Sequence, residues 1–231
     1  YFQIAPCFRD EDARADRSPG EFYQIDIEMS FVTQEDVFHA VEQLLYGLFS
    51  KFSDRPVTGT PFPRITYAES MLKYGTDKPD LRVPIEIQDV TDLFEGSEFK
   101  AFADEVANGG VIRALPVHGI GDQPRSFFDT MIEFAQNKGG KGLGYLVWTE
   151  EGIKSPITKF LDQATCDELQ RRGEMAPGDV MFFVADKKKT AEVVAGEVRL
   201  QLADMLELRK DDGFVFCWVI DYPMYEQDEE R

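Results

Sequence analysis

Cysteine and histidine are scarce in this chain of 231 residues, which holds three Cys and two His. The cysteines, Cys7, Cys166 and Cys217, stand at unrelated spacings, so the sequence contains neither a disulfide framework nor a CxxC metal motif. His39 and His118 are too few for a histidine-rich metal site. Because unpaired cysteines are typical of reducing compartments, we expect a cytoplasmic protein.

Long apolar runs are missing as well. No stretch approaches the ~18 apolar residues of a membrane-spanning helix, and we expect neither a signal peptide nor a membrane partner. The GGKG of residues 139–142 lacks the spacing and the following Ser or Thr of a phosphate-binding P-loop. The chain begins with YFQIAP instead of Met and ends with YEQDEER, and we expect it to be an internal piece of a longer protein.

Positive charge is in deficit, because 25 Lys and Arg stand against 43 Asp and Glu, a formal net charge of -18. This balance argues against nucleic-acid binding through a bulk basic surface. A few arginines can still act locally, since salt screens charges only beyond about 8 Å. The content of 43% hydrophobic and 13% aromatic residues predicts a well-packed globular protein.

The N-terminal part of the chain predicts an antiparallel β-hairpin. Residues 1–9 and 21–31 have the composition of strands, and the polar link between them ends in a Pro-Gly turn signal. In the second strand, alternation with period 2 places four side chains on one face: Phe22, Gln24, Asp26 and Glu28.

Helices and further strands follow the hairpin. Apolar spacing predicts a helix over 34–52, with Thr33 as its N-cap and Asp36 completing a capping box, and a short helix over 65–75 that Gly75 closes. After Pro84 the pattern alternates, with strands expected at 111–119, 142–148 and 179–186 and helices at 125–139, 164–173 and 188–206. The last helix is expected to bury one stripe, namely Val193, Val194, Val198, Leu202 and Leu206. This alternation indicates an α+β or α/β module, and a strand at 214–225 returns after it.

The hairpin also brings together residues that could carry chemistry. An arginine at the end of the first strand, Arg9, could clamp a phosphate and stabilise charge that develops on it. Asp26 and Glu28, two apart on the strand, could hold an ammonium group or a divalent cation, and Phe22 could stack a planar base. The alternative is a set of solvated surface ion pairs, each contributing about 0–1 kcal/mol.

The residues of this region carry a family resemblance. FRDEDARADR followed by EFYQIDIEMSF resembles motif 2 of class II aminoacyl-tRNA synthetases, in the form found in bacterial-type aspartyl-tRNA synthetases, and ITYAESMLKYGTDKPDLR is similar to the segment that follows it. GGKGLGYLVW, SPITKFL and GDVMFFVADKKK resemble the GAD domain that these enzymes insert between motifs 2 and 3. WVIDYPMYE resembles the return into the catalytic sheet, so the resemblance covers essentially the whole chain.

The resemblance implies an α+β fold in three parts. Residues 1–83 would be part of the antiparallel class II catalytic domain, 84–212 a GAD-like insertion domain, and 213–231 the return strand. It also implies site residues, which we list by role: catalytic, Arg9; ATP-binding, Arg9, Glu11, Phe22 and Gln24; aspartate-binding, Arg9, Gln24 and Asp26; tRNA-binding, Arg14, Asp16 and Arg17; metal, Glu28.

The function implied is that of an aspartate–tRNA ligase. Such an enzyme activates L-aspartate with ATP and Mg²⁺ to aspartyl-adenylate, then transfers aspartate to the 3′ end of tRNA(Asp). Whether tRNA(Asn) is also a partner is left open. The full-length protein would be a homodimer. The anticodon-binding domain, motif 1 and motif 3 lie outside these residues in the family, so we expect this piece to be inactive alone.

Two other functions remain open on the sequence. The chain could be a non-catalytic tRNA-binding module with a GAD domain, such as a subunit of a tRNA amidotransferase. It could also be a synthetase paralogue that makes a small amidated metabolite. The first has no reason to keep Arg9, Phe22, Asp26 and Glu28 together, and the second would lack an anticodon-binding domain.

Overall fold

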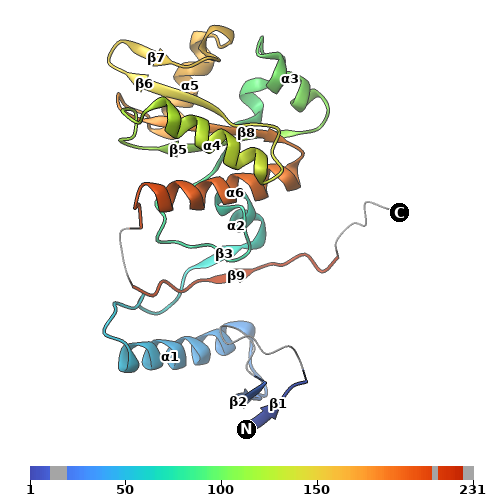
Figure 1. The fold of residues 1–231 in the computed structure, drawn as a ribbon. Helices are drawn as coiled ribbons and strands as arrows, with labels where there is room; N and C mark the ends of the chain where they lie inside the picture. Colours follow the sequence, from blue (N-terminus) through green and yellow to red (C-terminus); the bar gives the residue numbers. More distant parts are fainter. Residues whose placement is uncertain (11–19, 210–212, 226–231) are drawn as a thin grey trace. The chain divides into compact units, whose positions relative to one another are not determined.

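The computed structural model describes residues 1–10, 20–209 and 213–225. The chain divides into two compact units, Tyr1–Pro61 and Phe62–Arg231 (Figure 1). Within the described residues, no helix is long and apolar enough to cross a membrane.

The first unit contains the predicted hairpin. Strands β1 (Phe2–Phe8) and β2 (Glu21–Ile27) pair antiparallel, which confirms this prediction. β2 ends before residue 31 because β1 has no further residue to pair with it. At this end, the Glu28 N–H donates to the Tyr1 carbonyl oxygen and the Tyr1 amino group donates to the Glu28 carbonyl oxygen, both at 2.9 Å. The hairpin has one apolar, exposed face, made of Phe2, Ile4, Phe8, Tyr23, Ile25 and Ile27.

Helix α1 (Gln34–Phe52) follows at its predicted position. Asp36 Oδ2 accepts hydrogen bonds from the Thr33 N–H at 2.7 Å and from the Thr33 hydroxyl at 2.8 Å. These bonds, the backbone one above all, hold the pKa of Asp36 below its ordinary value. The apolar stripe of α1 stays partly exposed, with Val37 at 39% and Leu44 at 38%.

The second unit begins with a small parallel pair of strands. β3 (Arg64–Thr66) leads directly into α2 (Tyr67–Tyr74) and pairs in parallel with β9 (Trp218–Ile220). α2 ends at Gly75, whose φ of 69° is the left-handed C-cap that a glycine favours. The strand predicted over 214–225 is shorter in the structure because only β9 has a partner in β3.

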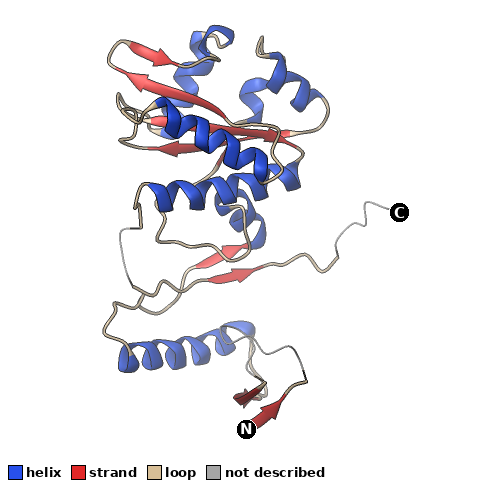
Figure 2. Cartoon of the chain, in the orientation of Figure 1, coloured by secondary structure: helices blue, strands red, loops and turns tan. Residues whose placement is uncertain are grey.

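The second unit contains a five-stranded sheet in the order β4-β5-β8-β6-β7. Figure 2 shows its strands in red. Its strands are β4 (Gln88–Asp89), β5 (Val111–Val117), β6 (Gly144–Thr149), β7 (Gly152–Lys154) and β8 (Val180–Asp186). Its helices are α3 (Lys100–Ala107), α4 (Arg125–Asn137), α5 (Gln163–Gly173) and α6 (Lys188–Met205), with 3-10 turns at Thr91–Phe94 and Thr158–Phe160. Every strand pair in this sheet is antiparallel, so the fold class is α+β.

Helices cover both faces of this sheet (Figure 1). On one face, α4 and α6 pack against Val180, Phe182 and Val184 of β8. On the other face, α3 and α5 pack against Met181 and Phe183. Because successive strand residues point to opposite faces, the continuous apolar run of β8 is buried on both sides.

Helix α6 buries a stripe that differs from the predicted one. Val194, Val198 and Leu202 are at most 1% exposed, and the predicted Leu206 packs against the same core. The prediction for Val193 is wrong, since this side chain is 45% exposed. Consecutive residues of a helix lie about 100° apart, which carries Val193 away from the face of its neighbour.

Candidate functional site

Arg9 lies at the end of β1, where the hairpin ladder continues for one more bond. Its N–H donates to the Gly20 carbonyl oxygen at 2.9 Å, which holds the backbone of Arg9 beside the start of β2. The Arg9 guanidinium carbon lies 5.3 Å from the centre of the Phe22 ring. This distance is within the range of a cation–π contact, so the structure brings these two predicted site residues together.

The register of the hairpin explains why one face can hold the site. Phe22, Gln24 and Asp26 lie opposite Cys7, Ala5 and Gln3, respectively, in that order along the strands. The side chains opposite Phe22 and Gln24 are small, and this leaves room above the second strand. At about 3.3 Å per residue, Phe22 and Asp26 stand roughly 13 Å apart along the strand.

Asp26 and Glu28 have partners that the sequence analysis missed. Gln3 donates from Nε2 to Asp26 Oδ2 at 3.1 Å, and the Tyr1 hydroxyl donates to Glu28 Oε1 at 2.9 Å. The bond to Glu28 raises the pKa of the Tyr1 hydroxyl. The antiparallel register places Gln3 opposite Asp26. Alternation along the first strand puts Gln3 on the same face as Ala5 and Cys7, but only the register of the pair sets it opposite Asp26.

The hairpin face therefore has two chemically different ends. Arg9 and Phe22 form an aromatic and cationic end, which suits a planar base and a phosphate. Asp26 and Glu28 form an acidic end, which suits an ammonium group or a cation that takes part of its ligands elsewhere. The described residues hold no group of three or more His, Cys, Asp or Glu side chains placed to bind a metal.

Four predicted site residues lie outside the residues that the structure describes. They are Glu11, Arg14, Asp16 and Arg17. Their roles in binding ATP and tRNA stay predictions.

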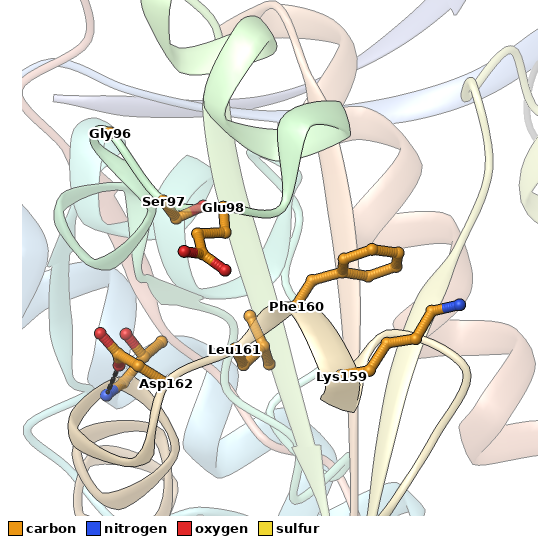
Figure 3. Close-up of a pocket in the computed structure, with 8 residues that line it drawn as sticks. Gly96, Ser97, Glu98, Lys159, Phe160, Leu161 and Asp162 are labelled. Carbon is orange, nitrogen blue, oxygen red and sulfur yellow. Dashed lines mark hydrogen bonds between the residues drawn. The ribbon is translucent and has the colours of Figure 1, made fainter.

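A separate pocket lies in the second unit, beside the start of α5 (Figure 3). It is lined by Gly96, Ser97, Glu98, Lys159, Phe160, Leu161, Asp162 and Thr165. Asp162 Oδ1 accepts a hydrogen bond from the Thr165 N–H at 2.7 Å, and this bond lowers the pKa of Asp162. The pocket carries exposed charges of both signs, from the acids Glu98 and Asp162 and from Lys159. It therefore does not clearly favour either a cationic or an anionic ligand.

Comparisons with known proteins place this sequence in a family. Residues 1–230 match the family model of class II tRNA synthetases (D, K and N). The chain is 56% identical over 231 residues to an "Aspartate--tRNA(Asp/Asn) ligase" of Rickettsia bellii (strain OSU 85-389). It is 55% identical to proteins of the same name from Orientia tsutsugamushi (strain Boryong), over 230 residues, and Rickettsia prowazekii (strain Madrid E), over 231 residues.

Each of these matches covers 100% of the chain but only 38% of the relative. The matched family agrees with the α+β fold and with the predicted hairpin. The chain belongs to the class II tRNA synthetases (D, K and N).

Proposed function

We propose that the chain is part of an aspartyl-tRNA synthetase that activates L-aspartate with ATP and then charges tRNA. The observation that carries this proposal is one face of the hairpin. It presents Phe22, Gln24 and Asp26 along β2, with Arg9 beside Phe22. The matched relatives are named as ligases of aspartate and tRNA(Asp/Asn), which supports the choice of substrates. Because the chain spans 38% of their length, the activity belongs to the longer protein.

In the activation step, a carboxylate oxygen of aspartate attacks the α-phosphorus of ATP, and the bond to the pyrophosphate leaving group breaks. No protein nucleophile is needed, because the substrate supplies it. The protein has to align the two substrates and stabilise the negative charge on the five-coordinate phosphorus. Arg9 supplies the positive charge, and Phe22 beside it offers a ring on which adenine can stack.

The acidic end of the face would bind the amino acid. Asp26 can accept hydrogen bonds from the substrate ammonium group while Gln3 holds its carboxylate in place at 3.1 Å. Gln24, between the two ends, can donate to an oxygen of the substrate. The roughly 13 Å between Phe22 and Asp26 leaves space for an adenylate whose base and ammonium group lie at opposite ends.

A magnesium ion fits this arrangement if substrate phosphates supply part of its ligands. Mg²⁺ keeps several waters and is usually bound by one or two carboxylates together with substrate phosphates. Glu28 offers such a carboxylate, and its partner there, the Tyr1 hydroxyl, uses only one of its oxygens. When bound, the ion would neutralise phosphate charge, and Glu28 would supply one of its carboxylate ligands.

The transfer step and the partners extend the proposal beyond the described residues. A hydroxyl of the terminal tRNA ribose attacks the acyl carbon of the adenylate, and AMP leaves. Arg14, Asp16 and Arg17 would contact the acceptor end of the tRNA, and Glu11 the adenine amino group. We further propose a homodimer, a catalytic part at 1–83, a GAD-like insertion at 84–212 and a return strand at 213–231. The pairing of β9 with β3 supports the return.

Substitution of Arg9 tests the assignment in the full-length protein. Arg9→Ala should lower aspartate-dependent ATP–pyrophosphate exchange by about 10²–10³-fold, the usual effect of removing one charge-stabilising donor. Arg125→Ala is the matched control, since the Arg125 side chain is 90% exposed and its Asp129 partner is 3.8 Å away. Exchange by Arg9→Ala within threefold of the control would refute the proposed role.

A second measurement separates the two ends of the face. Asp26→Asn should raise the KM for aspartate much more than the KM for ATP, because it removes charge only from the ammonium end. The 231-residue chain alone should show no exchange. Robust aspartate-dependent exchange by that chain would contradict the proposed need for the missing segments.

The alternative of a non-catalytic tRNA-binding module receives less support. Such a module would not need an arginine stacked on a phenylalanine at one end of a strand face and a carboxylate held by Gln3 at the other. Loss of exchange in Arg9→Ala with tRNA binding unchanged would favour the synthetase over this alternative.

A further inference from the structure

The chain crosses twice between the β3–α2 segment and the part of the second unit that holds the five-stranded sheet. We call residues 88–205, from β4 to the end of α6, the module. Residues 80–87 are its entry segment, and residues 206–209 are the described part of its exit segment. Three separate contacts hold α2, α6 and these two segments together.

The first contact is made by Arg199 of α6, whose side chain is fully buried. Its Nε donates to the Ile85 carbonyl oxygen at 2.6 Å, and its Nη2 donates to the carbonyl oxygens of Asp80 and Val83 at 2.8 and 3.0 Å. The guanidinium carbon also lies 5.0 Å from the ring centre of Tyr74, the last residue of α2. One side chain therefore holds the entry segment and touches α2.

This arrangement is unusual for a buried charge. Burial lowers the pKa of Arg199, because water no longer stabilises the charged form. A buried arginine is normally retained only where its donors find acceptors. Here the acceptors for Nε and Nη2 are backbone carbonyls of one short segment, whereas the buried Nη1 has no hydrogen-bond partner among the described residues. The three bonds that the charge does make therefore depend on the path of that segment.

The second contact is a crossing of backbones. A Cβ placed on Gly75 would lie 2.2 Å from the Glu192 carbonyl oxygen and 2.6 Å from the Gly196 Cα. A Cβ placed on Gly196 would lie 2.9 Å from the carbonyl oxygens of Gly75 and Tyr74. The end of α2 and the middle of α6 thus touch without any side chain between them. Only glycine on both sides permits this approach.

The third contact ties the two crossing segments to each other. Asp80 accepts two hydrogen bonds from the Arg82 side chain, each 2.8 Å long, and one from Arg209 Nε at 3.1 Å. Asp80 belongs to the entry segment and Arg209 to the exit segment. At the other end of the entry segment, the Ile87 N–H donates to the Lys73 carbonyl oxygen of α2 at 2.9 Å.

We propose that Arg199 is a positioning residue that locks the entry segment between α2 and α6 and thereby fixes the orientation of the module on the β3–α2 segment. Any one of these contacts alone would leave the module free to rotate about it. The glycine crossing sets the distance between α2 and α6, Arg199 fixes the path of the entry segment, and the Asp80–Arg209 pair closes the exit. This inference concerns the architecture and does not depend on the proposed substrates.

Hydrogen exchange on the full-length protein tests the lock. In Arg199→Met, which keeps the length of the side chain but loses its donors, amides of residues 80–87 should exchange at least tenfold faster. Amides of β5 and β8 should stay within threefold of wild type, because the core of the module is untouched. Arg125→Met is the matched control and should change neither region, since that arginine is 90% exposed. Unchanged exchange at 80–87, or equal acceleration in the sheet, would overturn the proposal.

A distance measurement tests the orientation directly. Spin labels at Ala68 of α2 and Ser126 of α4, both exposed, should give one narrow distance distribution in wild type and a broader one in Arg199→Met. Arg199→Lys keeps the charge but not the planar fork, so it should resemble Arg199→Met. A distribution that stays narrow in either variant would overturn the assignment.

If Arg199→Met fails to fold, Asp80→Asn provides a milder test. It weakens the closure between the entry and exit segments without opening a buried site, because Asp80 is 20% exposed. Exchange at 80–87 should then rise by at least threefold with the sheet unchanged. No rise there would count against the lock.

Discussion

The contact between Gly75 and Gly196 allows a sharp test of how tightly α2 and α6 approach each other. In Gly75→Ala, the new methyl group would lie 2.2 Å from the Glu192 carbonyl oxygen, so the backbone of α6 has to move. Gly96 offers a matched control. It has the same φ of 69°, but a Cβ placed there meets nothing within 4 Å.

The two substitutions share one cost and differ in another. Alanine in the left-handed region costs about 1–2 kcal/mol, of which the stiffer unfolded chain returns about 0.4–1 kcal/mol. Gly96→Ala should therefore lower the free energy of unfolding by about 1 kcal/mol or less. Gly75→Ala carries the same strain and adds about 1–3 kcal/mol for forcing packed backbones apart, a loss of about 1–4 kcal/mol in total.

Urea unfolding of the 231-residue chain measures both losses, with circular dichroism and the fluorescence of Trp148 as probes. Trp148 is 3% exposed in the core that includes α5, so its emission reports on the second unit. The free energies follow from the shifts in midpoint at constant slope. Equal losses for the Gly75 and Gly96 variants, within about 0.5 kcal/mol, would refute the close crossing of α2 and α6.

Three further outcomes follow from the structure. Val194→Ala should cost about 2–3 kcal/mol of unfolding free energy, and Val193→Ala about 0 kcal/mol, because only Val194 is buried; similar losses in urea unfolding would contradict this. Asp80→Asn should cost about 1–3 kcal/mol at pH 7. Hydrogen bonds from Arg82 hold the pKa of Asp80 well below its usual range, so this cost should shrink as pH falls below about 4, and a cost that grows in acid would be inconsistent. Asp179→Ala should cost about 2 kcal/mol by thermal unfolding, since its carboxylate accepts from two backbone N–H groups and an imidazole; a loss under about 0.5 kcal/mol would refute that.

Elements with strong local patterns could be predicted from the sequence. Periodicity, caps and turn signals predict the hairpin, α1 and α2. They also predict the longer strands of the sheet, β5, β6 and β8, and the helices α4, α5 and α6 that cover it. The short elements β3, α3, β4 and β7 were not predicted, and Ile65 and Thr66, which begin the helix predicted over 65–75, belong to β3. α3 is eight residues long and β4 is two, too short for a period to stand out from the surrounding loop. Their positions are set by the sheet they join.

The sequence predicts which residues of β2 share a face at the candidate site, but not their partners on β1. Alternation with period 2 places Phe22, Gln24 and Asp26 on one face, and the structure has them there. The bond from Gln3 to Asp26 depends on the register in which β1 and β2 pair. A slip of one residue in that register would move every side chain of a strand to the other face. Composition does not determine that register.

The contrast between the hairpin and the lock has a physical basis. The bond that holds Asp26 spans 23 residues of sequence within one hairpin, whereas the bonds of Arg199 to Ile85 and of Arg209 to Asp80 span 114 and 129 residues. Contacts between residues close in sequence can be predicted from the pattern around them. Arg199 lies on the apolar stripe of α6, which indicates that its donors need acceptors, but the sequence does not show that residues 80–85 supply them. The chemistry proposed for the hairpin and the orientation proposed for the module should therefore respond to different substitutions. Arg9→Ala should reduce exchange with little loss of stability, because Arg9 is exposed and its main-chain bond to Gly20 is retained. Arg199→Met should loosen the module first, and any loss of activity should follow from that.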